Sequence, residues 1–571
     1  MSSVNRREYL TANVLDQAFL DRCQDNLDNG LHMVVVIDTP TGYIYASDRN
    51  KYINSTFYEA LTQFPIISRT VGDWLSPEIE FSSLDLVLSN VDGRFNNFVP
   101  GGVDYDGWIG KTVTVSLGLR DVASTYSDIY KGVVTEIGGF KRDVQKITLR
   151  SRDDFDKANK TMPTTALTST SFPDLEENFE GLVAPYILGD WTVNLNPNGA
   201  SIPAFPVNGA NAGVIAGTTA LQLVISDNAN SYFDSSHVYV KRGEQYFVFD
   251  SGDIAVNGDK NLVEITQGAG GGTTTVEDGD PYLYTNGDAF FVRVKGKDLG
   301  SYDDNIIWQA REILMDYGGL SSGDFDANWA TYRDKATPAE SATASIKARV
   351  WVGEPQETVK YVLQMLEQVR LEAFVSRDQK FKLNSMHFDD FIAPASISYS
   401  VKNWDLSKSS FSPVSDDINT WNRAKGDYNF DPNKNENLFS TDIYRNQAAI
   451  TQAGKEISKL IVFPNLYVKS DVINQLSETL KLASAYPEYI EATLSSRAIL
   501  RDIGDFVLVD VKIGSSIFSE VPAMIREIGY DPDGMKVPCK LLSLQMVPYT
   551  GYAPTYSGIV GGSTATITQE T

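Results

Sequence analysis

The 571-residue sequence contains only two cysteines, Cys23 and Cys539, and three histidines. The cysteines lie far apart and lack metal-type spacing, which excludes a disulfide framework and a cysteine-based zinc site. His32, His237 and His387 fall in separate regions without the spacing of a zinc site or of a Ser-His triad. We therefore expect structural histidines, no metal and no cofactor.

Long hydrophobic runs are also missing. No stretch approaches the length of apolar residues that crosses a bilayer, and the N-terminus "MSSVNRREYLTANVL" has no signal-peptide core. The sequence therefore predicts a chain that is made and folded in the cytoplasm, without stable membrane insertion.

Positive charge is scarce. The 49 Lys and Arg face 74 Asp and Glu, which gives a net charge of -25. Such a surface repels phosphate backbones, so a conventional nucleic-acid binder is excluded. The hydrophobic fraction of 42% indicates folded cores, and the length indicates several domains.

Three patterns resemble functional motifs but depart from them. The carboxylate pairs Glu176-Glu177 and Asp416-Asp417 suit glycoside hydrolysis, but in so acidic a chain such pairs arise by chance. "DPNKNENLFSTD" resembles a calcium loop, yet Glu436 replaces the required glycine and Asp442 the bidentate glutamate. "GAGGGTTT" at 268–275 lacks the Gly-Lys-Ser/Thr of a phosphate loop and is typical of a hairpin tip. We expect no catalytic residues.

Composition and periodicity predict a mainly β (α+β) fold with two related antiparallel β-barrel domains, an inserted β domain and a helical middle segment. The N-terminal region 1–74 combines a predicted helical segment, "YLTANVLDQAFLDRCQDNL", with a predicted buried strand, "HMVVVID". The predicted domains that follow are the first hub barrel 75–170, the inserted β domain 171–296, the helical and hairpin domain 297–395, the second hub barrel 396–549 and a flexible tail 550–571.

Period-two alternation predicts the first barrel, beginning with Leu84, Leu86 and Leu88. Helical periodicity predicts two helices, in "NIIWQAREILMDYGG" and "PQETVKYVLQMLEQV", and "EAFVSRDQKFKL" alternates as a hairpin. We expect residues 78–165 and about 396–549 to superpose as related barrels.

The sequence "SNVDGRFNNF" predicts a turn after the strand that contains Leu84, Leu86 and Leu88. Asn90 and Asp92 are turn formers, and Gly93 can adopt a positive φ without strain. Arg94 separates this glycine from Phe95, which together with Phe98 can plug the barrel end. We interpret the turn as structural, because polar turns seldom carry catalytic groups.

"LDLVLSNVDGRFNNF", followed by "WIGKTVTVSLG", "IYKGVVTEI" and "KITLRSRDDFD", resembles the first barrel of the baseplate or tail hub family of tailed bacteriophages. The matching positions are the structural turn Asn90, Asp92, Gly93, Arg94 and Phe95, and the later glycines Gly110 and Gly132. Further motifs follow in the family's order through "RDIGDFVLV" and "IREIGYDPDG".

The resemblance implies a structural virion protein. Hubs of this family are homotrimers whose two barrels per subunit form a pseudo-sixfold ring, which joins the tail tube protein to a spike or tip protein and to neighbouring baseplate subunits. Genomic DNA passes through the ring only in transit, and an acidic lumen suits this passage because it does not retain phosphates. The implied location is the phage tail baseplate, assembled in the host cytoplasm.

Two alternatives stay open. The 28 Tyr, 27 Phe and 8 Trp could stack on sugars in a receptor- or carbohydrate-binding tail-tip protein, if tryptophans of the insertion are exposed. A tail-associated cell-wall hydrolase would instead need a cleft with a tuned acid or a metal.

Overall fold

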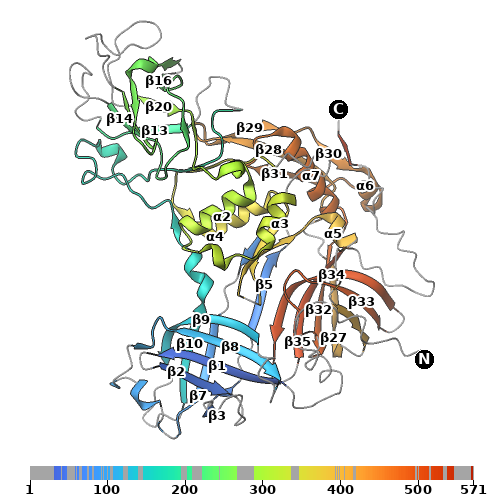
Figure 1. Ribbon diagram of the computed structural model, residues 1–571. Helices are drawn as coiled ribbons and strands as arrows, with labels where there is room; N and C mark the ends of the chain where they lie inside the picture. Colours follow the sequence, from blue (N-terminus) through green and yellow to red (C-terminus); the bar gives the residue numbers. More distant parts are fainter. Residues whose placement is uncertain are drawn as a thin grey trace.

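A computed structural model of the chain describes residues 31–544 and 567–569 apart from internal gaps, the longest of which are 48–57, 120–126, 139–145, 194–201, 209–220, 266–287 and 336–345. The predicted N-terminal helix, the Gly-rich stretch 268–275 and the pair Asp416-Asp417 lie outside the described residues. The fold is mainly β, as predicted, with two large antiparallel barrel sheets below a group of helices (Figure 1).

The first barrel sheet has eight strands in the order β3-β2-β1-β8-β9-β10-β7-β4. Its inward positions alternate as the sequence predicts, with Leu84, Leu86 and Leu88 of β7 buried in the core. The strands are β1 (Leu31–Thr39), β2 (Gly42–Ser47), β3 (Tyr58–Glu59), β4 (Leu61–Gln63), β7 (Ser83–Ser89), β8 (Thr112–Leu119), β9 (Ser127–Gly138) and β10 (Lys146–Asp153).

The N-terminal region 1–74 is not a separate unit where the structure describes it. Strands β1 to β4 complete the first barrel sheet, because β1 pairs antiparallel with β8. The next strand, β5 (Ile67–Asp73), leaves this sheet and pairs with β34 of the second barrel and with β6 (Ser76–Ile79). One strand from the N-terminal region thus crosses between the two barrels.

The second barrel sheet has the order β26-β33-β34-β35-β32-β27. Its core residues belong to the same hydrophobic cluster as those of the first barrel, so the two barrels pack as neighbours. The strands are β26 (Tyr399–Lys402), β27 (Leu406–Ser415), β32 (Pro487–Ser495), β33 (Phe506–Ile513), β34 (Ser516–Tyr530) and β35 (Lys536–Leu544).

The segment predicted as the second barrel also contains another module. Between β27 and β32 the chain forms two helices and four strands of a five-stranded sheet, and α7 packs on β28 of this sheet rather than inside the barrel. The C-terminal strand β36, within the predicted flexible tail, pairs with β30. The elements are β28 (Arg423–Asp431), β29 (Glu436–Ser440), β30 (Tyr444–Asn446), α6 (Gln447–Ala453), β31 (Ser458–Phe463), α7 (Lys469–Ala483) and β36 (Ile567–Gln569).

The two barrels contain the same four-stranded unit. In the first barrel β8, β9 and β10 form a meander whose last strand pairs antiparallel with the preceding strand, β7. In the second barrel β33, β34 and β35 form a meander whose last strand pairs antiparallel with β32. The order of connection and the direction of every pairing are the same.

The pairing register and the bulges of the two units also correspond. Ser89 faces Lys146 in the first unit as Ser495 faces Lys536 in the second. The register shifts directly after the pairs Val115–Tyr130 and Val509–Val521. A second shift skips Thr135 of β9 and, at the corresponding position of β34, Arg526. Because bulges are specific features of a sheet, their recurrence indicates two copies of one structural unit.

Each unit opens with the same glycine turn. The Gly110 amide donates to the Val134 carbonyl at 2.7 Å, and the Gly504 amide donates to the Ile525 carbonyl at 2.9 Å. The two glycines have φ values of +78° and +82°. A glycine is required at both places because the left-handed region strains other residues.

The surroundings of this turn distinguish the barrels. A Cβ on Gly504 would lie 2.9 Å from the Asn384 side chain, whereas one on Gly110 would meet nothing within 4 Å. The neighbouring Ile503 is buried, but Ile109 is 51% exposed. The turn is therefore covered in the second barrel and open in the first.

The sheet of the inserted domain lies between residues 202 and 292 and has the order β17-β16-β20-β13-β14-β19-β18. Alternate residues of β13 are buried, and two of them, Ile202 and Ala204, build a separate core with Trp191 and Phe290. The strands are β13 (Ile202–Pro206), β14 (Leu221–Val224), β16 (Tyr239–Arg242), β17 (Gln245–Val248), β18 (Ile254–Val256), β19 (Leu262–Ile265) and β20 (Ala289–Val292).

The middle segment contains the two predicted helices, α2 (Ile306–Asp316) and α4 (Thr358–Glu367), and the predicted hairpin of β24 (Leu371–Val375) and β25 (Phe381–Ser385). The N-cap of α2 is Asn305, whose Oδ1 accepts the amides of Ile307 and Trp308. The other short elements are β11 (Thr161–Met162), β12 (Tyr186–Leu188), β15 (Tyr232–Phe233), β21 (Val294–Lys295), α3 (Asn328–Lys335), β22 (Val350–Val352), β23 (Gln356–Glu357) and α5 (Phe388–Ile392).

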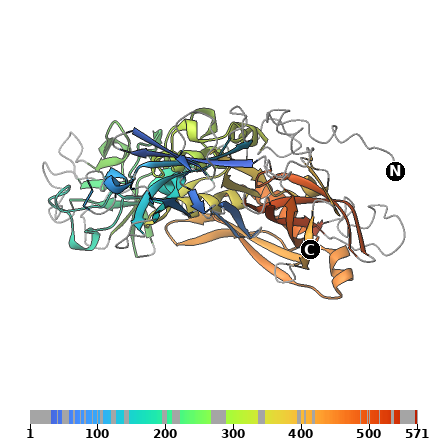
Figure 2. The same ribbon diagram turned by 90° about the horizontal axis from the view of Figure 1, so that it is seen from below.

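Helices α2, α3 and α4 occupy the centre of the molecule, between the inserted domain and the two barrels (Figure 1). Seen from below, the molecule is elongated and thin, with the first barrel and the second barrel side by side (Figure 2). No helix in the described ranges is long and apolar enough to cross a membrane.

Candidate functional site

The turn after β7 is organised by the side chain of Asn90, which is buried. Its Oδ1 accepts the Phe95 amide at 2.8 Å, and its Nδ2 donates to Asn96 Oδ1 at 2.9 Å. The Gly93 amide donates to the Asn90 carbonyl at 3.0 Å, and Gly93 has φ +72°. Asn90 thus holds the chain in a tight reversal that requires glycine at position 93.

One side chain of this turn is buried in the barrel core, and another is exposed to solvent. Phe95 is 2% exposed and belongs to the barrel core, whereas Val91 at the tip is 77% exposed. Asp92 and Arg94 lie outside the described residues, as does the side chain of Phe98. The described geometry is that of a packing turn with an apolar tip.

Gly93→Val should lower the free energy of unfolding by about 1–3 kcal/mol, because valine is strained at this φ. The new side chain would also meet Asn96 Nδ2, which lies 2.8 Å from a Cβ built on Gly93. Chemical denaturation of the purified variant measures the cost. Gly101→Val is the matched control, since Gly101 has a similar φ of +84° but open space around its Cβ. Equal stability of Gly93→Val and wild type would contradict the assigned role.

A second site lies where β5 joins the two barrels. Arg69 on β5 donates to the Ile129 carbonyl of β9 in the first barrel. Its guanidinium also lies 3.6 Å from the Asp502 carboxylate, in the turn that opens the second barrel unit. Arg69 is 7% exposed, so this contact is shielded from solvent and fixes the barrels to each other.

A buried ion pair attaches the second barrel to the helical segment. Arg526 of β34 binds the carboxylate of Glu372 on β24, and both side chains are almost fully buried. The same guanidinium donates to the Gly72 carbonyl of β5 at 2.8 Å. Arg526 occupies the bulge position of β34, which releases its side chain from the sheet alternation.

Burial raises the pKa of Asp502 and of Asp505, and for Asp505 the neighbouring Asp502 carboxylate raises it further. Arg69, Arg501 and Lys382 oppose these shifts without cancelling them. The folded state therefore binds protons more tightly than the unfolded chain, in which aspartate titrates near ~3.9.

The thermal unfolding midpoint should consequently rise as the pH falls from 7 to 5, since stability is gained as the pH drops through raised folded-state pKa values. Asp505→Asn should reduce this rise, because it removes one of the two groups. Exposed Asp259→Asn, which also removes one negative charge, should leave the rise as in wild type. Scanning calorimetry at both pH values checks the prediction, and a midpoint that falls between pH 7 and pH 5 would contradict it.

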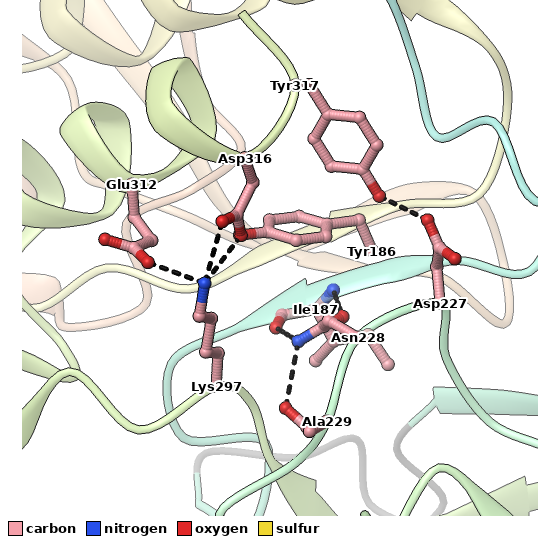
Figure 3. A network of polar contacts seen from close by, with 9 residues as sticks. All are labelled: Tyr186, Ile187, Asp227, Asn228, Ala229, Lys297, Glu312, Asp316 and Tyr317. Carbon is pink, nitrogen blue, oxygen red and sulfur yellow. Dashed lines mark hydrogen bonds and ion pairs between the residues drawn. The ribbon is translucent and has the colours of Figure 1, made fainter. Parts of the chain in front are cut away.

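A polar network attaches the inserted domain to α2 (Figure 3). Lys297 Nζ lies 2.6 Å from Glu312 and 2.8 Å from Asp316, both on α2. Tyr186 of β12 donates to the same Asp316 at 2.7 Å, and Tyr317 donates to Asp227. Burial raises the pKa of Tyr186, with Asp316 adding to the effect, so the phenol stays protonated as a donor.

The side chain of Asn228, next to Asp227, binds the backbone of β12 as a neighbouring strand would. Its Oδ1 accepts the Ile187 amide at 2.9 Å and its Nδ2 donates to the Ile187 carbonyl at 2.8 Å (Figure 3). Both polar backbone groups of Ile187 are thereby satisfied by one side chain. The start of the inserted domain is held by paired hydrogen bonds rather than by a single contact.

Arg349 connects three modules. Its guanidinium lies 4.1 Å from the ring centre of Trp191 and donates to the Val193 carbonyl at 3.0 Å, both at the start of the inserted domain. It also donates to Asn429 of β28 and lies over the ring of Tyr467. Burial lowers the pKa of Arg349 to about 10, which leaves it cationic at neutral pH.

His237 and His387, the histidines whose side chains the structure describes, each lie beside a carboxylate. His237 pairs with Asp234 at 2.6 Å, and His387 lies 3.9 Å from Glu478, which also binds Lys481 at 2.6 Å. Within the described ranges, no three His, Cys, Asp or Glu side chains lie close enough to hold a metal. Asp431, the first residue of the calcium-like stretch, ends β28 and leads into a hairpin turn.

Sequence reasoning found the turn but missed the charged residues between modules. Glu372 and Arg526 each lie in a mainly apolar strand sequence, "LEAFV" and "AMIREIGY", whereas Arg69 lies in the more polar "ISRTVGD". A charge within an apolar strand is the available signal, because such groups are buried only when paired. Their partners lie more than 100 residues away, as Glu372 and Arg526 show.

The fold and these junctions define a two-barrel β protein. No protein-family model matches the chain, and no curated protein matches it. Solved structures similar to it include the tail protein from Neisseria meningitidis MC58, with 8% identity and a TM-score of 0.39 over 90% of this chain and 97% of that one.

Two further similar structures come from prophages. The 43 kDa tail protein of prophage MuSo2 from Shewanella oneidensis has 10% identity and a TM-score of 0.35, over 89% of this chain and 97% of that one. A prophage tail protein from Listeria monocytogenes EGD-e has 11% identity and a TM-score of 0.25, over 64% and 95%. All three of these similar structures are described as tail proteins.

Proposed function

We propose that the chain is a structural protein of a phage tail, the hub that joins the tail tube to the tip or spike. The repeated barrel unit is the observation that supports this most directly. The two units share strand order, register and both bulge positions, so one chain contains the same backbone unit twice.

A homotrimer of such chains is a ring with six barrel units, which matches a sixfold partner on one side and a threefold partner on the other. The tail tube protein is the sixfold partner in this proposal, and the spike or tip protein is the threefold one. Neighbouring baseplate subunits surround the ring in the virion. DNA passes through it in transit, and the net charge of -25 disfavours its retention.

The protein works in this proposal by assembly and not by catalysis. The buried ion pairs and polar networks join modules to one another, which suits a part that bears load within a particle. The carbohydrate-binding alternative required exposed tryptophan in the insertion. Trp191 is buried at the base of that domain, and none of the tryptophans in the described ranges is exposed.

Native mass spectrometry at high protein concentration, combined with proteomics of purified tail particles, tests the proposal. We expect a trimer in solution or in complex with a tail partner, and the chain in every particle. A monomer under all conditions together with particles that lack the chain would contradict it. Degradation of bacterial wall by the purified protein in a zymogram would favour the hydrolase instead.

A further inference from the structure

A set of three charged residues recurs at corresponding positions of the two barrels. In the first barrel Arg150 of β10 lies between Asp85 of β7 and Glu136 of β9, at 3.1 Å and 3.0 Å. We call these the first triad. In the second barrel the corresponding residues are Glu491 of β32, Lys540 of β35 and Glu527 of β34, the second triad.

The correspondence follows from the register and not from a choice of alignment. Arg150 pairs with Asp85 on one side and with Glu136 on the other. Lys540 pairs with Glu491 and with Glu527 in the same way. Both basic residues directly precede the register shift whose extra residue lies on β9 and on β34. Each triad is therefore an acid, a base and an acid across three adjacent strands.

The surrounding outward positions do not match. Lys131 of β9 pairs with Thr114, four residues after Gly110, and Pro522 of β34 pairs with Leu508, four residues after Gly504. Lys131 therefore corresponds to Pro522. Val133 corresponds to Met524 at the next outward position. The charge pattern is thus kept at the triads while neighbouring side chains differ in size and charge.

The exposed ion pairs of the first triad contribute little to the stability of the fold. Arg150 is 55% exposed and its two partners are similarly exposed, and solvent-exposed ion pairs contribute little. Asp85 and Glu136 raise the pKa of Arg150, so this side chain remains cationic. In the second triad Lys540 lies 4.4 Å from the ring centre of Tyr489, and Glu491 is exposed. The signs of the charges are thus repeated although their contacts differ, which points to a common binding partner.

We propose that the two triads are equivalent docking points for a ring of identical subunits, each of which meets one barrel. This inference rests on the proposed function and names the surface by which the sixfold partner is bound. Each triad carries two carboxylates and one cation, hence one net negative charge. The partner surface is therefore basic, with lysine side chains that bind the outer carboxylates.

Inverting the charges of both triads tests the inference. The variant Asp85→Lys, Glu136→Lys, Arg150→Glu keeps an alternating triad in the first barrel, so its cross-strand pairs are retained. Glu491→Lys, Glu527→Lys, Lys540→Glu is the same change in the second barrel. We expect incorporation into tail particles to fall at least tenfold for the combined variant, with similar partial losses for each half. The thermal midpoint should stay close to that of wild type.

Lys131→Glu is the matched control, since it changes an exposed charge on β9 at a position that the second barrel does not repeat. It should assemble as wild type does. Full incorporation of a folded combined variant would overturn the inference, as a purely sheet-stabilising role predicts that result.

Wild-type particles provide the test if the combined variant fails to fold. A zero-length carbodiimide cross-linker joins carboxylates to lysines in contact, and mass spectrometry locates the links. Links from both triads to one other particle protein support the inference. Links only within this chain overturn it and leave the hub function standing. Particles without the chain overturn both.

Discussion

Glu372→Ala should lower the free energy of unfolding by about 3–5 kcal/mol, because it leaves the Arg526 guanidinium buried without its carboxylate. Both side chains are almost fully buried, and Arg526 also binds the Gly72 carbonyl of β5. The substitution therefore weakens the contact of the second barrel with the hairpin and with β5 together. Denaturation with urea, followed by tryptophan fluorescence, measures the loss.

A variant that replaces both charged residues distinguishes the contribution of the ion pair to stability from that of side-chain packing. The double variant Glu372→Met, Arg526→Met removes both charges at similar volume, and it should recover most of the loss of the single variant. A single variant as stable as wild type would show that the buried pair does not join the modules.

Gly504→Val should cost more than Gly110→Val, although the two glycines occupy the same position in their barrels. Strain at positive φ costs each variant about 1–3 kcal/mol. At Gly504 the side chain also meets Asn384 of β25, which adds about 1–3 kcal/mol of overpacking. Unfolding curves of the two variants measure the difference.

Asn384→Ala in the Gly504→Val background is the control. It should recover the overpacking part of the cost and leave the strain. Equal costs at the two glycines would show that the hairpin does not cover the second barrel turn, and would contradict the asymmetry between the barrels.

Local patterns predicted the elements whose burial is regular. The alternation at Leu84, Leu86 and Leu88 faces a single core, so period two identifies β7 directly. The helical period identifies α2 and α4 for the same reason, since one face of each is buried. Gly93 was predictable because a turn after a strand restricts the residue types that fit.

The assignment of strands to sheets was not predictable in the same way. β5 pairs with β34, more than 400 residues later, and nothing in "ISRTVGD" specifies that partner. The five-stranded sheet with α7 has the same short alternating strands as a barrel, so segment 396–549 reads as one domain. Such pairings are fixed by long-range packing, which periodicity does not report.

The sequence predicts two related barrels, but the residues that correspond between them became visible only through the pairing register. The core residues Leu149 and Cys539 occupy corresponding positions but share no side-chain chemistry, so a sequence comparison of these strands is weak. The bulges and the glycine turns carry the likeness, because backbone geometry constrains them more than side-chain identity does.

The most direct test of the central claim is a cryo-electron microscopy map of a tail particle that contains the chain, computed without imposed symmetry. The account predicts three copies in a closed ring, with first and second barrels alternating in six equivalent positions against the next ring of the tail. A map in which the chain lies outside the tail axis, or in which only one barrel of each copy contacts that ring, would contradict it.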